Sequence, residues 1–147
     1  MNQVFCHRRI VRFGECDPAG VVYYPVFFNW FHEAMEAWFE EALEVPYADA
    51  LTQFGFPAAQ TEASFKRPFR LGDAVSIELR IKRFGQSSFT LQFRCKSQEH
   101  VCATGSVTCV CIRHSGEKTG FDFASTPLPK RLRERMEAYQ MTNPELK

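Results

Sequence analysis

The residues best suited to chemistry lie in one short stretch, from residue 13 to residue 25. It reads Phe-Gly-Glu-Cys-Asp-Pro-Ala-Gly-Val-Val-Tyr-Tyr-Pro and places a carboxylate, Asp17, on a turn between two apolar segments. Burying a carboxylate costs free energy unless a partner group stabilises it or the protein needs it for function. Apolar segments on both sides of the turn can shift the pKa of the carboxyl toward a value suited to acid–base catalysis. We therefore take Asp17 as the candidate catalytic group. The alternative is a turn aspartate that accepts hydrogen bonds from its own backbone.

The elements on either side must position this turn. Residues 4–13 read as a first strand, and Pro18 and Gly20 supply the turn chemistry. From residue 25 to residue 43 apolar side chains recur at spacings of three and four, which predicts a long helix with a wide apolar face. These side chains are Phe27, Phe28, Phe31, Ala34, Met35, Trp38, Phe39 and Ala42.

Strand patterns dominate the rest of the chain. Apolar and polar residues alternate over 75–82 and again over 89–95, and residues 102–114 form a third run rich in Val, Thr and Cys. Residues 59–65 add a shorter strand. One strand, one long helix and then an antiparallel meander predict an α+β fold, in which the helix packs on one face of a curved sheet.

The C-terminal segment reads as a separate element of the same protein. Residues 127–146 carry apolar side chains at near-helical spacing among many charges, which predicts an amphipathic helix docked on the surface. We therefore expect a main domain over residues 1–126 and a helical extension over 127–147. The apolar side chains of the extension are Leu128, Leu132, Met136 and Tyr139.

The stretch from Phe13 to Pro25, with the Val-Phe-Phe-Asn-Trp that follows it, resembles the signature of the 4-hydroxybenzoyl-CoA thioesterase family. The likeness is fair along most of the chain and slight beyond about residue 125. It implies the hotdog fold, a curved antiparallel β-sheet wrapped around one long central α-helix, and the hydrolysis of acyl-CoA. It also implies a homodimer or homotetramer, in which two sheets join and each active site draws on both subunits.

The resemblance also assigns roles at the turn. Asp17 would either attack the thioester carbonyl, giving an anhydride, or take a proton from the attacking water, and the sequence does not choose between these. Negative charge then builds on the carbonyl oxygen, and the backbone N–H that stabilises it maps onto Tyr24 at the start of the helix. Plain packing is the alternative for the Tyr24 side chain.

Two positions bear on the acyl group. Related cell-envelope thioesterases usually carry histidine where this chain has Tyr24, which favours the hydroxybenzoyl-type branch. Hydroxybenzoyl-specific members, however, carry an acidic residue two positions after Trp30, where this chain has His32. An imidazole can accept or donate the same hydrogen bond to a ring hydroxyl. A solvated helix residue is the alternative for His32, and a short-chain acyl group is the alternative substrate.

Further candidates for substrate binding follow from the matching motif and from the chemistry of CoA. Gly20 belongs to the motif, and the aromatic helix face around Trp30 suits a flat acyl group, although core packing explains it too. The phosphates of CoA require basic side chains near loops, which favours the turn that holds Arg83, Ser87 and Ser88. The other basic clusters are Lys66 and Arg67 with Arg70, and Arg113 with His114.

Composition narrows the class of protein. A net charge of +1 argues against a dedicated nucleic-acid or membrane-surface protein. No signal peptide or long apolar run stands out, so we expect a cytoplasmic protein whose six cysteines are reduced. We expect no cofactor and no metal, because Cys109 and Cys111 on one strand, with His114 nearby, lack a second ligand pair. A thiol-nucleophile role for Cys16 finds no activating partner.

Two functions from different classes remain. The first is an acyl-CoA thioesterase with Asp17 at its centre. The second is a hotdog protein that binds acyl-CoA or another partner without hydrolysing it. The presence of Asp17 favours the first, because a binding protein has no need of it. A hotdog hydratase needs an Asp and a His in a different motif, which this chain lacks.

Overall fold

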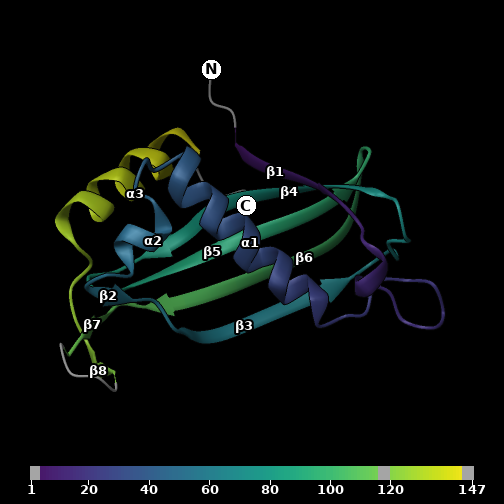
Figure 1. The fold of residues 1–147 in the computed structure, drawn as a ribbon. Coiled ribbons are helices and arrows are strands. Elements are labelled where there is room, and N and C mark those ends of the chain that lie inside the picture. Colours follow the sequence, from purple (N-terminus) through teal and green to yellow (C-terminus); the bar gives the residue numbers. More distant parts are fainter. Residues whose placement is uncertain (1–3, 116–119, 144–147) are drawn as a thin grey trace.

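The computed structural model describes residues 4–115 and 120–143. Its main element is a five-stranded antiparallel sheet with the spatial order β1-β4-β5-β6-β3, so that β1 and β3 form the two edges (Figure 1). The strands are β1 (Phe5–Ile10), β3 (Ala58–Phe65), β4 (Ala74–Phe84), β5 (Ser88–Ser97) and β6 (His100–Val110).

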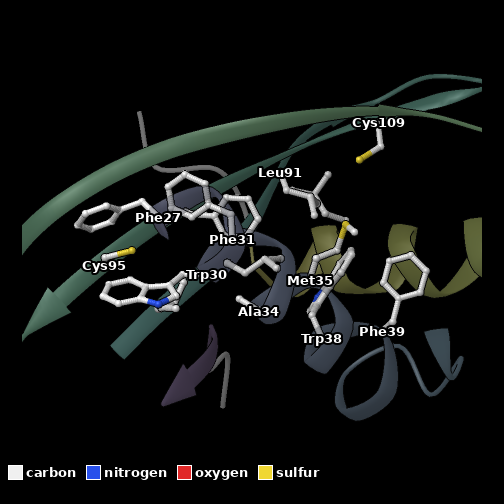
Figure 2. Close-up of a cluster of buried hydrophobic side chains, with 14 of the residues drawn as sticks. Phe27, Trp30, Phe31, Ala34, Met35, Trp38, Phe39, Leu91, Cys95 and Cys109 are labelled. Atoms are coloured by element: carbon white, nitrogen blue, oxygen red, sulfur yellow. The ribbon is translucent and has the colours of Figure 1, made fainter. Parts of the chain in front are cut away.

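Helix α1 (Val26–Glu41) lies across one face of this sheet and supplies more of the described core residues than any other single element (Figures 1 and 2). The alternating apolar residues of β4 and β5 point toward it and are buried, as the sequence pattern predicts. The Phe31 ring stacks on Phe93 with ring centroids 4.7 Å apart. At Gly105 a Cβ atom would lie 2.4 Å from the Phe31 ring, so only glycine lets the helix approach β6 this closely.

The smaller elements gather where α1 ends (Figure 1). Helix α3 contributes Leu132, Met136 and Tyr139 to the same core as α1. The Tyr139 hydroxyl donates to the Leu79 carbonyl and accepts from the Phe5 N–H at 3.1 Å, which ties α3 to β4 and β1. These elements are α2 (Tyr47–Ala50), α3 (Lys130–Thr142) and a three-stranded sheet of β2 (Phe54–Gly55), β7 (Ile112–His114) and β8 (Phe121–Ser125).

The α+β layout expected from the sequence is confirmed, with one correction among the strands. The run over residues 102–114 is not one strand, because the chain leaves the main sheet at Cys111 and continues as β7. The Cys111 N–H donates to the Ser87 carbonyl at 2.7 Å, and the Cys111 carbonyl accepts from Thr126 at 2.9 Å. These bonds redirect the backbone into the smaller sheet.

All six cysteines are free, and four of them lie in the core. Burial raises the pKa of Cys95 and of Cys109 to about 12, which keeps both thiols protonated and unreactive near neutral pH. Within residues 4–115 and 120–143, no helix is long and apolar enough to cross a membrane.

Candidate active site

Residues 15–17 and 21–23 form a short antiparallel ladder around the β-bridge between Cys16 and Val22, and this ladder, which contains Asp17, lies between a 3₁₀ turn (Phe13–Glu15) and helix α1. The Asp17 N–H donates to the Val21 carbonyl at 2.9 Å, and at the other end of the ladder the Tyr23 N–H donates to the Glu15 carbonyl at 2.9 Å. Gly20 closes the loop with φ at +83°, a left-handed conformation that favours glycine. The backbone on both sides of Asp17 is therefore fixed.

The two carboxylate oxygens of Asp17 have different surroundings. Oδ1 accepts from the Ala19 N–H at 2.9 Å and from the Val21 N–H at 3.4 Å, the bonds expected of a turn aspartate. Oδ2 accepts no hydrogen bond from the described part of the chain, and the half-buried side chain forms no ion pair there. One oxygen thus orients the carboxylate while the other remains available.

The start of α1 leaves one backbone amide without an acceptor. The N–H groups of Val26–Phe28 donate to carbonyls three residues earlier, and Pro25 has no N–H. The Tyr24 N–H, by contrast, finds no acceptor among residues 4–115 and 120–143. Because a strand rises about 3.4 Å per residue, Asp17 and the ladder end beside Tyr24 are roughly 7 Å apart. The free carboxylate oxygen therefore belongs to a residue of the ladder, and the free donor lies one residue beyond the other end of that ladder, at the start of the helix.

Glu15, two residues before Asp17, is a feature that sequence reasoning missed. Its carboxylate accepts from Arg9 Nη1, from the Arg12 N–H and from Trp30 Nε1, each at 2.8 Å. Partial burial alone raises the pKa of this carboxyl, but these hydrogen bonds and the charge of Arg9 outweigh it and hold the pKa below its ordinary value. The sequence feature that could have indicated this role is an acidic residue within a motif rich in aromatic residues.

Trp30 is 1% exposed, so its ring offers almost no surface to a ligand in this chain. Its indole N–H is committed to Glu15, and its ring packs edge-on against Phe69 with centroids 5.6 Å apart. In this chain Trp30 itself is therefore packed in the core, one of the two interpretations that the sequence left open.

Two of the grooves that border α1 are lined by predicted site residues, Tyr24 in one and His32 in the other. The first, which we call the Tyr24 groove, has a volume of about 350 Å³ and lies at the start of the helix. Tyr24 and Phe65 are 60% and 49% exposed on its walls, with ring centroids 6.5 Å apart. Lys66 and Arg67 border it and form no ion pair within the described residues.

The second groove, which we call the α1–β3 groove, has a volume of about 320 Å³ and a largely apolar lining. His32 is a polar residue of this lining. Its Nε2 lies 2.9 Å from Glu36 Oε1, and its ring meets the Tyr47 ring edge-on. The lining includes Phe28, Phe31, Met35, Phe56, Thr61 and Cys109.

The basic turn that holds Arg83, Ser87 and Ser88 lies at the opposite end of the molecule from Asp17. Arg133 of α3 donates to the Gln86 carbonyl of this turn at 2.8 Å, and α3 also binds the chain just after the end of α1. Asp17 precedes the start of α1, and a helix of 16 residues is about 24 Å long. The structure therefore does not bring this turn to Asp17 of the same chain.

A curved antiparallel sheet around one long helix, with a free carboxylate oxygen and a free amide where that helix begins, defines a hotdog protein of the thioesterase type. Residues 11–136 match the thioesterase-like superfamily, and the chain belongs to it. The match extends into α3, further than the motif alone indicated. The hotdog fold expected from the sequence is thus confirmed, and the family is confirmed at the level of this superfamily.

Individual proteins are similar over most of the chain. A 1,4-dihydroxy-2-naphthoyl-CoA hydrolase of Prochlorococcus marinus (strain MIT 9303) is 34% identical over 104 residues, which cover 65% of this chain and 69% of the relative. A solved gentisyl-coenzyme A thioesterase is 28% identical with a TM-score of 0.80, covering 90% of this chain and 99% of its own. A Staphylococcus aureus protein solved in complex with CoA shares the fold, with 13% identity, a TM-score of 0.85 and coverage of 99% and 89%.

Proposed function

We propose that this protein hydrolyses the thioester bond of an acyl-CoA whose acyl group is a hydroxylated aromatic ring. The observation that carries the proposal is the pair of unused groups where the ladder leads into α1, Asp17 Oδ2 on the ladder and the Tyr24 N–H one residue beyond it. A thioester hydrolase needs both, a carboxylate to act on the carbonyl carbon or on water and a donor for the carbonyl oxygen.

The reaction follows from these two groups. Either Oδ2 of Asp17 attacks the carbonyl carbon, the CoA thiolate leaves, and water then hydrolyses the anhydride, or Asp17 takes a proton from water as that water attacks. In both routes the tetrahedral intermediate carries a negative oxygen, and the Tyr24 N–H donates to it. Both routes release a free acid and CoA, and the bonds from Ala19 and Val21 orient the carboxylate throughout.

The α1–β3 groove supports an aromatic acyl group. Its apolar lining suits a flat ring, and His32 supplies a polar group at that lining for a ring hydroxyl. The relatives point the same way, because the naphthoyl-CoA hydrolase and the gentisyl-CoA thioesterase are both named for hydroxylated aromatic acyl groups. A 4-hydroxybenzoyl group belongs to the same chemical class.

A second copy of the chain would complete the binding site for CoA. Strand β3 is an edge of the sheet and is exposed along almost its whole length, which leaves it free to pair with another strand. In a dimer formed there, we propose that Arg83, Ser87 and Ser88 of one chain meet the phosphates of CoA whose thioester lies at Asp17 of the other. Within one chain, Lys66 and Arg67 of the Tyr24 groove are the alternative.

The test is a thiol-release assay with 4-hydroxybenzoyl-, 1,4-dihydroxy-2-naphthoyl-, benzoyl- and short straight-chain CoA thioesters. The wild type should prefer the hydroxylated aryl thioesters, and Asp17→Asn should lower the rate about 10²-fold or more. Asp49→Asn, in the exposed helix α2, is the matched control and should keep the wild-type rate. Full activity of Asp17→Asn would contradict the carboxylate mechanism, and binding of these thioesters without turnover would establish the non-hydrolytic alternative.

A further inference from the structure

The carboxylate of Glu15 joins three separate segments of the chain. It accepts from Arg9 on β1, from the backbone N–H of Arg12 in the preceding loop, and from the indole of Trp30 on α1. The Glu15 carbonyl also accepts from the N–H of Tyr23, the residue before the free amide. A single residue therefore contacts both the ladder of Asp17 and the helix whose start it adjoins.

The two oxygens of the Glu15 carboxylate together satisfy the three donors. An ionised Glu accepts at both oxygens, and here Oε1 faces Arg9 and Arg12 while Oε2 faces the Trp30 N–H. Glutamine has one acceptor oxygen, so its NH₂ group would face a donor whichever way the amide turned. The Glu15 and Arg9 side chains are only 19% and 14% exposed, so water does not readily replace the lost bond.

We propose that Glu15 is a positioning residue for the reaction, holding the Asp17 ladder in register against the start of α1. The proposal rests on the proposed function, because it presumes that Asp17 and the Tyr24 N–H act together on one carbonyl. Effective reaction requires the reacting atoms to be held to within a fraction of an ångström, and small displacements are costly in rate. Glu15 acts through these two groups and does not itself meet the substrate.

Glu33 offers a matched control in the same network. Its Oε2 lies 3.0 Å from Arg9 Nε and 2.7 Å from His7 Nε2, so it contacts the same arginine from the other side. It is 44% exposed and, within the described residues, forms no hydrogen bond or ion pair with the ladder or with Trp30. Glu33→Gln removes one charge beside Arg9, as Glu15→Gln does, but leaves the tie to the ladder intact.

The experiment compares these two variants by kinetics. With an aryl-CoA that the wild type hydrolyses, Glu15→Gln should lower kcat about 10-fold or more while KM changes less than about threefold, because the lost geometry matters most in the transition state. Glu33→Gln should keep the wild-type kcat. Wild-type kcat in Glu15→Gln, or an equal fall in both variants, would overturn the proposal.

A second readout does not depend on activity. Amide hydrogen exchange should show faster exchange of the Tyr23 and Asp17 N–H groups in Glu15→Gln and unchanged exchange in Glu33→Gln, with the core strands protected in both. Unchanged exchange at these amides would overturn the positioning role even if the wild type is a thioesterase. If the wild type hydrolyses no thioester but this exchange is faster, the proposed function fails while the structural tie stands.

Discussion

At position 32 an imidazole lines a largely apolar groove, and its hydrogen bond to Glu36 decides which ring nitrogen it can offer a ligand. Nε2 of His32 faces the Glu36 carboxylate, which leaves the other ring nitrogen for a further hydrogen bond. With Nε2–H donating to Glu36, the neutral ring can accept a hydrogen bond from a ligand hydroxyl at Nδ1. We therefore expect His32 to contribute to the choice of acyl group.

His32→Ala should raise KM for a hydroxylated aryl-CoA by about five- to tenfold, the equivalent of about 1 kcal/mol for one lost hydrogen bond. Benzoyl-CoA, which lacks the hydroxyl, is the internal control, and its KM should stay near the wild-type value. The measurement is steady-state thiol release with both substrates. Equal losses for both would mean that His32 only shapes the groove and does not recognise the hydroxyl.

Among elements, α3 is tied to two strands of the sheet by one buried hydroxyl, in addition to its packing in the core. Tyr139 donates to the Leu79 carbonyl and accepts from the Phe5 N–H, so a single residue ties the C-terminal helix to two strands. Its ring also packs edge-on against Trp38 with centroids 5.3 Å apart. The segment is thus part of the core, as well as the amphipathic surface helix that its spacing predicts.

Tyr139→Phe should lower the free energy of unfolding by about 1–3 kcal/mol, because it leaves a buried carbonyl and a partly buried N–H without a partner. The ring and its packing remain, so the loss reports the hydroxyl alone. Urea unfolding followed by tryptophan fluorescence measures it. Tyr47→Phe removes a hydroxyl that bonds to nothing within the described residues and should change stability by less than about 0.5 kcal/mol. Equal effects of the two variants would contradict the tie.

The elements predictable from the sequence are those with a period. The spacing of apolar residues along α1 and their alternation along β4 and β5 predict which face of each element is buried. The structure buries those faces. The short elements α2, β2 and β8 have no such period, because two to five residues record no face. They form where tertiary contacts place them.

In the candidate site too, some residues could be predicted from the local sequence and others could not. Asp17 and Tyr24 are local, because turn chemistry and a helix start mark them in the sequence. The role of Glu15 depends on Arg9, six residues before it, and on Trp30, fifteen residues after it, which meet only once the helix lies on the sheet. No periodicity in the sequence encodes that meeting. The opposite placement of Arg83 and Asp17 likewise follows from the sheet order, which the strand patterns leave undetermined.

At the scale of the whole molecule, this opposite placement bears on assembly. The basic turn and Asp17 lie at the two ends of α1, yet a two-fold dimer paired through the β3 edges reverses one copy relative to the other. Such reversal brings the turn of one chain toward the Asp17 end of its partner. We therefore expect Asp17 and Arg83 to serve one substrate from two chains, and this expectation can be tested without knowing the shape of the dimer.

Asp17→Asn and Arg83→Ala can be combined by joint refolding or co-expression. At a substrate concentration below the KM of the wild type, each variant alone should be nearly inactive, and the mixture should regain activity. Half of the random dimers are mixed, and each has one site with both native residues, so about a quarter of the wild-type rate should return. Asp17→Asn mixed with Gly20→Val is the control, because both changes affect the same turn and no mixed dimer has a native site. If the first mixture gains nothing over the average of its two variants, each chain binds CoA by itself, and Lys66 and Arg67 become the phosphate ligands to test.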